Sequence, residues 1–262
     1  MLFEKTVEIS PETAFTGSIN INGPFELTDL YTEMVDTGNN EVLVSYQPVK
    51  PKGKGELPEE VKKPALPKDI KTIEELYLTG IRILQFHNPT LDATDYFSEA
   101  LKCDPNDIRT NIAVGNIHLK NWEYTLARSY FDTAIRRLTR DYTRPSTCEA
   151  LYQQGLTLRG LGLYDEAVDN LYRATWDYAW FSAAYLELAK ISCLRGDYRK
   201  ALEQVKHSLA TNMKNNSAIN LKASIQRRLG DLNGAKTTIK DLLKNDPLDF
   251  RAGNSESAGP GC

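Results

Sequence analysis

The chain has 262 residues, of which 41% are hydrophobic and 26% charged, and its formal net charge is −3 with a pI of about 5.8. These values fit one or two globular domains and exclude a general electrostatic attraction to nucleic acid or to an anionic membrane. No apolar run approaches the roughly 20 residues of a membrane span, and the charged start, Met1 to Glu8, lacks the apolar core of a signal peptide. We therefore expect a cytoplasmic protein with no nucleic-acid or membrane partner.

Residues 1–48 alternate apolar and polar side chains, which is typical of β-strands. Gly38-Asn39-Asn40 favours a hairpin turn between the last two runs. Strands are expected at residues 6–10, 16–22, 30–37 and 41–47. Because four short strands bury little surface, this small antiparallel β segment is expected either to pack on the helical part or to be the end of a larger β-domain.

Residues 49–70 are rich in proline and lysine, a composition that interrupts both helix and sheet. This segment is predicted to be an extended, partly solvated linker. Its lysine-rich start has a second interpretation as a basic patch. The glutamates that follow at once, Glu56, Glu59 and Glu60, favour the linker.

From Ile73 the pattern becomes helical and repeats. In the clearest unit Gly115 precedes Ala127 by twelve residues, and Phe131 and Ala134 follow at helical spacing. Five units have a small residue on the first helix, then an alanine and a larger apolar residue on the second: Gly80/Ala93/Phe97, Gly115/Ala127/Phe131, Gly155/Ala167/Leu171, Ala189/Ala201/Val205 and Ala223/Ala235/Ile239. About six extra residues lie around Leu138 to Pro145, before the third unit.

The small residues allow the two helices of a unit to approach closely, and the larger apolar residue is expected to fill the gap to the next unit. Each unit buries its apolar face only against its neighbours, so the predicted fold class is mainly α, an α-solenoid of about five helix-turn-helix repeats over residues 71–250. Residues 251–262 are predicted to be a disordered tail.

This spacing resembles that of the tetratricopeptide repeat (TPR) family, from Ile73 to about Phe250. The resemblance implies a right-handed superhelix whose concave groove is lined by the first helix of each repeat. It also implies an interaction scaffold that binds a protein or peptide partner in this groove. The groove residues that it implies are Tyr77, Arg109, Asn116, Lys120, Tyr152, Arg159, Lys190, Asn220 and Arg227.

Basic side chains outnumber the acidic Glu74 and Glu149 at the implied groove positions. The groove is therefore expected to be locally basic and to accept an acidic or carboxylate-terminated peptide. The alternative is that these are solvated charges on helix faces. The lysine–asparagine clamp that some family members use for a terminal carboxylate is incomplete, because Asn116 matches it and Ile112 stands where its lysine is expected.

No enzymatic activity, cofactor or metal site is expected. The three histidines are scattered over separate repeats, the four cysteines form no group at ligand spacing, and neither a phosphate loop nor a nucleophile elbow occurs. The aromatic run of residues 174–181 has two interpretations. Packing at the junction between repeats three and four is favoured over a surface that stacks on a ligand.

A second resemblance rests on Lys71 to Gly80, Asp104 to Arg109, Ala134 to Thr139 and Ala174 to Trp180. These stretches are similar to the C-terminal repeats of large bacterial proteins that carry an aldose-epimerase-like domain of unknown function. The resemblance implies an alternative role as a structural or oligomerisation arm of a larger carbohydrate-related bacterial enzyme whose catalytic domain is absent here. No polar capping element follows the last repeat at Asp246 to Phe250. Because an uncapped apolar end can pair with a second copy, we expect a homodimer through this end.

Overall fold

The computed structural model describes residues 2–9, 15–50, 53, 63–87 and 89–257. The chain divides into two compact units, Met1–Lys62 and Lys63–Cys262, and each is described by itself. The division falls within the predicted linker, residues 49–70, much of which lies outside the described residues.

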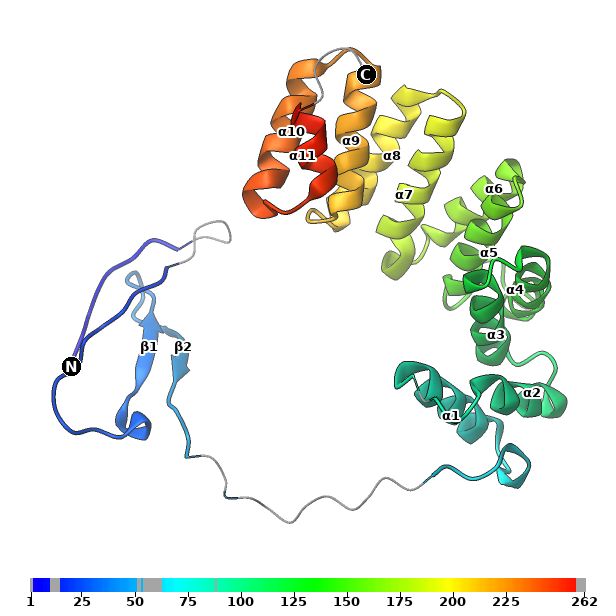
Figure 1. Cartoon of the computed structure of the whole chain (residues 1–262), viewed down its shortest axis with the longest axis horizontal. Helices are drawn as coiled ribbons and strands as arrows, with labels where there is room; N and C mark the ends of the chain where they lie inside the picture. The colour runs from blue at the N-terminus through cyan, green and yellow to red at the C-terminus, as the bar shows by residue number, and fades with distance from the viewer. Residues whose placement is uncertain (1, 10–14, 51–52, 54–62, 88, 258–262) are drawn as a thin grey trace. The chain divides into compact units, whose positions relative to one another are not determined.

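The N-terminal unit contains one antiparallel hairpin of β1 (Thr32–Val35) and β2 (Val42–Tyr46), as predicted (Figure 1). The Asp36 carboxylate accepts a hydrogen bond from the Gly38 amide at 2.7 Å, which helps to close the turn. A short 3-10 helix, η1 (Leu27–Asp29), precedes β1. The strands predicted at 6–10 and 16–22 are wrong, because their described residues form no strand. Alternation favours a strand, but a strand also needs a neighbour for its backbone hydrogen bonds.

The helical unit begins with a second 3-10 helix, η2 (Pro67–Asp69), at the end of the predicted linker. This end packs on the first repeat: the Tyr96 hydroxyl donates to the Ala65 carbonyl at 3.0 Å, and Ile70 is buried in the first hydrophobic cluster. The linker is therefore anchored from Ala65 onward.

Five helix pairs follow one another along an arc in the helical unit, so the predicted α-solenoid of five repeats is confirmed (Figure 1). The pairs are α1 (Ile73–Gln85) with α2 (Ala93–Cys103), α3 (Ile108–Lys120) with α4 (Tyr124–Leu138), α5 (Glu149–Gly160) with α6 (Tyr164–Ala174), α7 (Tyr178–Leu194) with α8 (Tyr198–Thr211), and α9 (Asn216–Arg228) with α10 (Leu232–Asn245). A last helix, α11 (Phe250–Ser257), has no pair among the described residues.

Small residues set the distance between the helices of each pair. A Cβ atom added at Gly115 would lie 2.6 Å from the ring of Phe131, which is fully buried. The same contact joins Gly80 to Phe97 and Gly155 to Leu171. The larger residue therefore fills a space inside its own repeat, and Phe131 also belongs to a cluster with Ala150 of the next repeat.

Short polar residues begin most of the helices. An N-cap side chain accepts a backbone N–H of the first turn and satisfies one of its free donors. Residues that do so are Thr72, Asp92, Asp107, Asp177, Asp197, Asn215 and Asp231.

The turn inside each pair requires a left-handed residue. Repeats three to five place Gly162, Gly196 and Gly230 there, with φ between 76° and 84°. Repeat two has Trp122 at φ 65°, and repeat one has His87 at φ 47°. Side chains with a Cβ are strained in this region, so the first two repeats contain local strain that glycine avoids in the others.

The predicted insertion lengthens the connection between repeats two and three. It occupies residues 139–148, whereas residues 104–107 connect repeats one and two and residues 212–215 connect repeats four and five. The connection that follows repeat two is therefore longer than those that follow repeats one and four.

The chain end differs from the predicted disordered tail, because α11 covers residues 250–257. Ala252 is buried against Ala223, Ile239 and Leu242 of the last repeat, so α11 covers much of the apolar end that the sequence left uncapped. The predicted tail beyond residue 257 lies outside the described residues.

Candidate functional site

The first helices of the repeats form the inner row of the helical unit. Each contacts its own partner helix and also the first helix of the neighbouring repeat: α1 with α3, α3 with α5, α5 with α7, and α7 with α9. In a curved stack, the row whose members approach one another most closely lies on the concave side. The groove positions expected from the sequence lie on these five helices (Figure 1).

At the N-terminal end of this row, α1 and α3 are joined through Arg109. Its guanidinium pairs with both carboxylate oxygens of Glu74 and lies 4.7 Å from the centre of the Tyr77 ring. The hydrogen bond from Arg109 holds the pKa of Glu74 below its ordinary value. Arg109 is therefore oriented by its own chain and can offer a ligand only its remaining donors.

Between α3 and α5, Asn116 hydrogen-bonds to Glu149. Burial raises the pKa of Glu149 above its ordinary value, and the hydrogen bond from Asn116 opposes this shift in part. The only clamp residue matched in the sequence is thus engaged by a carboxylate of the protein itself.

The centre of the row holds a buried carboxylate with two cations. Glu187 of α7 pairs with Arg159 of α5, and its second oxygen accepts from Lys190 at 2.6 Å. Tyr152 stacks on Trp180 with ring centres 4.9 Å apart, and burial raises the pKa of Tyr152 to about 12. The structure therefore brings Tyr152, Arg159 and Lys190 together.

Glu187 was missed in the sequence analysis. Its i,i+3 spacing to Lys190 was an available signal, since residues three apart are neighbours on a helix. Glu187 reduces the excess positive charge that the sequence indicated for the groove. The cations at the implied positions still outnumber the carboxylates Glu74, Glu149 and Glu187.

The remaining expected residues lie apart from this centre. The Asn220 amide donates to both carboxylate oxygens of Asp249, at 3.2 and 3.1 Å, and so ties α9 to the turn before α11. Lys120 is exposed at the end of α3 and makes no ion pair with any residue that the structure describes. Arg227 is half-buried in the last turn of α9.

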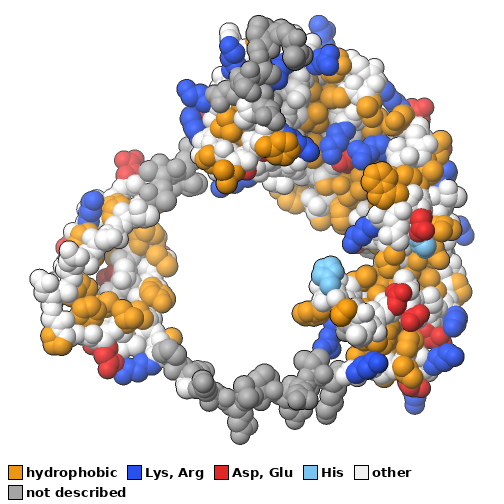
Figure 2. Space-filling model, in the orientation of Figure 1, with side chains coloured by type: hydrophobic (Ala, Val, Ile, Leu, Met, Phe, Trp, Pro, Cys, Tyr) orange, Lys and Arg blue, Asp and Glu red, His pale blue; other side chains and the backbone are white. Residues whose placement is uncertain are grey.

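Polar and apolar side chains alternate over the helical unit. Figure 2 shows lysine and arginine side chains beside hydrophobic ones on the face turned to the viewer. Such a mixture of apolar area with placed charges is typical of peptide-binding surfaces.

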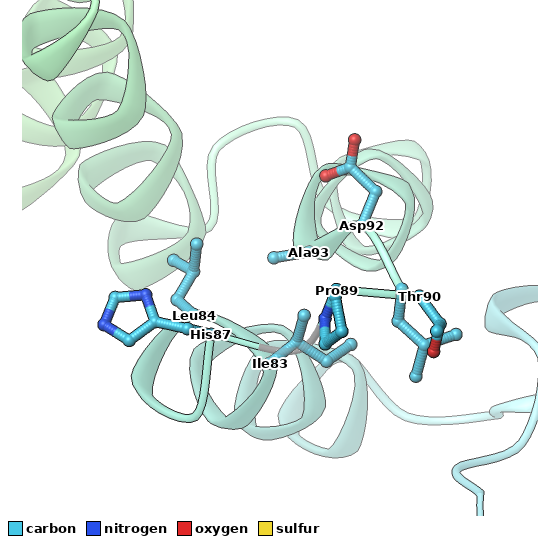
Figure 3. Close-up of a pocket in the computed structure, with 8 residues that line it drawn as sticks. Ile83, Leu84, His87, Pro89, Thr90, Asp92 and Ala93 are labelled. Atoms are coloured by element: carbon cyan, nitrogen blue, oxygen red, sulfur yellow. The ribbon is translucent and has the colours of Figure 1, made fainter.

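A shallow depression of about 450 Å³ lies at the turn of the first repeat (Figure 3). Its lining residues are Ile83, Leu84, His87, Pro89, Thr90, Leu91, Asp92 and Ala93. The Asp92 carboxylate caps α2 by accepting from the Thr94 amide at 2.8 Å. The depression therefore presents one histidine and a carboxylate that already has a structural role.

His118 stacks on Tyr130 with ring centres 5.3 Å apart, and its Nδ1 lies 2.6 Å from the Glu123 carboxylate. Among the residues that the structure describes, no group of three or more histidine, cysteine, aspartate or glutamate side chains could hold a metal ion. Within the same described part of the chain, no helix is long and apolar enough to cross a membrane.

Solved structures of TPR proteins share this fold. No family model matches the sequence. The chain is similar to PilW, a widely conserved type IV pilus biogenesis factor, with a TM-score of 0.61 and 22% identity over 72% of this chain and 85% of PilW. YrrB, described as a TPR protein with an unusual peptide-binding site, has a TM-score of 0.55 and 16% identity over 71% and 90% of the two chains.

A third structure is TTC0263, a TPR protein of Thermus thermophilus, with a TM-score of 0.51 and 18% identity over 71% of this chain and 97% of its own. At these identities the likeness concerns the fold. The helical unit is therefore a TPR-type α-solenoid, in agreement with the predicted fold class. These likenesses do not support a link to proteins with an aldose-epimerase-like domain.

Proposed function

We propose that this protein is a non-enzymatic interaction scaffold that binds a segment of a protein partner in the groove lined by α1, α3, α5, α7 and α9. The observation that supports this most directly is the central cluster of Tyr152, Trp180, Arg159, Glu187 and Lys190. It combines stacked aromatic area with cations that a buried carboxylate holds in place. Preorganised side chains of this kind bind with a smaller loss of conformational entropy.

The ligand chemistry that we propose is a carboxylate, on an acidic side chain or at a peptide terminus. Lys190 has donors beyond its bond to Glu187, and Lys120 is exposed and makes no ion pair with any described residue. Charge-assisted hydrogen bonds from such groups are stronger than neutral ones. The carboxylates Glu74, Glu149 and Glu187 oppose binding of highly acidic ligands, which favours a segment with few carboxylates over a polyanion.

The test is peptide binding to the full chain, measured by fluorescence anisotropy. The probes are a labelled library in which Asp and Glu alternate with Leu and Ser, and its neutral counterpart with Asn and Gln. We expect the acidic library to bind more tightly, and Lys190→Ala to weaken that binding roughly tenfold, as for loss of one charge-assisted hydrogen bond.

The matched control is Lys206→Ala, which removes an exposed lysine from α8 on the outer row and should leave the affinity unchanged. Acidic peptides that bind no better than neutral ones would refute the ligand chemistry. Equal losses in both variants would refute the groove as the binding site.

We also propose a homodimer through the C-terminal end of the helical unit. Since α11 covers Ala223, Ile239 and Leu242, the remaining apolar surface there includes the exposed Leu248 and Phe250. A strict monomer in light scattering at high concentration would exclude this dimer. A cytoplasmic, bacterial setting is likewise proposed from the sequence.

The alternative role, an arm of a larger carbohydrate-related enzyme, rests on the sequence resemblance alone. It predicts that deleting the helical unit from such an enzyme would alter assembly while the chemical step remains intact. Measurement of oligomeric state and turnover of the two forms would separate this role from peptide binding.

A further inference from the structure

The loop of residues 139–148, which follows α4, packs against the junction between α6 and α7. The Arg144 guanidinium donates to the Trp176 carbonyl at 2.8 Å, and Arg173 reaches the Thr143 carbonyl at 3.5 Å. The Cys148 amide donates to the Asp177 carboxylate at 3.1 Å. Three hydrogen bonds thus fasten the loop of residues 139–148 to the turn between α6 and α7.

Aromatic side chains are displayed on both parts of this junction. Tyr142, on the loop, is 78% exposed, and Tyr178 and Trp176, at the turn, are 76% and 43% exposed. The sequence favoured packing for the aromatic run of residues 174–181, and this is wrong for Trp176 and Tyr178, which are exposed. Trp180 and its neighbour Phe181 do pack, on Tyr152 and Tyr185 respectively.

Arginines surround these rings. Arg140, Arg144 and Arg173 lie on or beside the fastened loop, and Arg173 lies 5.9 Å from the centre of the Trp176 ring. Of the nearby carboxylates, Asp141 pairs with Arg140. The oxygens of Asp177 already accept the amides of Cys148 and Ala179. The surface is therefore locally basic in a chain with a net charge of −3.

We propose that this junction platform, defined as Arg140, Tyr142, Arg144, Arg173, Trp176 and Tyr178, is a second interaction surface that binds an acidic segment of a partner protein. Tryptophan, tyrosine and arginine are the residue types that dominate binding energy at protein interfaces. Exposed aromatic rings contribute little to folding, and a loop fastened in advance loses little entropy on binding. The platform shares no residue with the central groove cluster.

A protein segment fits this surface better than a nucleic acid. The net charge of −3 disfavours the long-range attraction that phosphate backbones require, and Asp141 pairs with Arg140 of the platform. An acidic peptide with apolar residues can pair with the arginines and place its apolar side chains on the rings.

The test uses the full chain carrying Lys120→Ala and Lys190→Ala, which weakens the groove, together with the acidic and neutral peptide libraries described above. We expect the acidic library to retain binding that weakens as salt is added. The double change Tyr142→Ala and Tyr178→Ala should reduce this remaining affinity by about tenfold or more, as for hot-spot residues. Both side chains are exposed, so folding should be unaffected.

Phe86→Ala is the matched control, because Phe86 is 76% exposed and lies at the end of α1, in another repeat. It should leave the affinity unchanged. Arg140→Glu tests the charge and should abolish the preference for acidic over neutral peptides.

Loss of all acidic-peptide binding in the Lys120→Ala, Lys190→Ala background would overturn the platform and leave the groove proposal intact. Binding of a single-stranded RNA oligonucleotide in preference to the acidic library would also overturn it. If the platform variants alone lose binding, the platform stands and the groove does not.

Discussion

Repeats two and four have the same sequence spacing between their packing positions and occupy those positions with side chains of different size. In repeat two, Gly115 on α3 faces the large ring of Phe131 on α4. In repeat four, Ala189 on α7 and Val205 on α8 belong to one buried cluster. Ala189 is larger than Gly115 and Val205 is smaller than Phe131, so repeat four places more of the side-chain volume on its first helix and less on its second. The repeat specifies the total volume between its helices, and the individual residues share it.

The two repeats also differ at their turns and exits. Repeat two turns at Trp122, whose φ is 65°, and leaves through the loop of residues 139–148. Repeat four turns at Gly196, and Asp197 then caps α8 by accepting from the Lys200 amide. The irregular features of repeat two are therefore concentrated outside its core, where a partner can reach them.

Phe131→Ala is expected to have the largest effect. It would leave a cavity beside Gly115 that no neighbouring side chain fills, at a cost of about 3–5 kcal/mol in the free energy of unfolding. Val205→Ala in repeat four should cost less, because it removes fewer atoms from a similarly buried position. Chemical denaturation of both variants measures the difference, and equal costs would contradict the volume argument.

Gly115→Ala should come next. The new Cβ would lie 2.6 Å from the Phe131 ring, and overpacking of this kind costs about 1–3 kcal/mol. The higher helix propensity of alanine returns up to about 1 kcal/mol.

The double variant Gly115→Ala with Phe131→Val converts repeat two to the pairing of repeat four. It should be more stable than the sum of the two single changes predicts, which a double-mutant cycle in denaturant measures. Strict additivity would show that the two positions do not share volume.

Trp122→Gly should stabilise the protein by roughly 1 kcal/mol, because glycine takes a positive φ without strain. Trp122→Ala is the control: it removes the same ring and keeps a Cβ at φ 65°, so it should give no comparable gain. Thermal unfolding compares them. An equal gain in both variants would mean that loss of the ring, and not relief of strain, is responsible.

The smallest expected effect concerns Glu149, which follows the long exit of repeat two. Burial raises its pKa, so the fold is favoured when Glu149 is protonated and loses that contribution as pH rises through the raised pKa. Glu149→Gln should therefore be more stable than the natural protein at neutral pH and equal to it in acid. Glu74→Gln, at a carboxyl whose pKa is lowered, should show the opposite sign at neutral pH. Thermal unfolding across pH measures both, and the same sign for both would contradict the assignment.

The sequence predicted the repeats well and the N-terminal unit less well. Small residues such as Gly115, with Ala127 and Phe131 at fixed spacing, specify a local helix pair that few other arrangements satisfy. The runs at 6–10 and 16–22 alternate correctly, yet a strand depends on a distant neighbour that alternation does not identify.

The residues expected to line the groove lie on the first helices of the repeats, whereas the sequence did not predict which carboxylates pair with its cations. Arg109 and Arg159 are visible as cations in the sequence, whereas their pairing with Glu74 and Glu187 depends on contacts between different repeats. The pairing of Lys190 with Glu187 lies within α7 and could have been read from their i,i+3 spacing. The exposure of Tyr142 and Trp176 likewise depends on how the loop of residues 139–148 packs on the turn between α6 and α7.

The most direct test of the central claim is photo-crosslinking of a bound acidic peptide to the full chain, with the modified residues read by mass spectrometry. The groove proposal predicts crosslinks on α3, α5 and α7, centred on the region of Tyr152 and Lys190. Crosslinks confined to the outer helices α4, α6 and α8, or to the loop of residues 139–148, would contradict it.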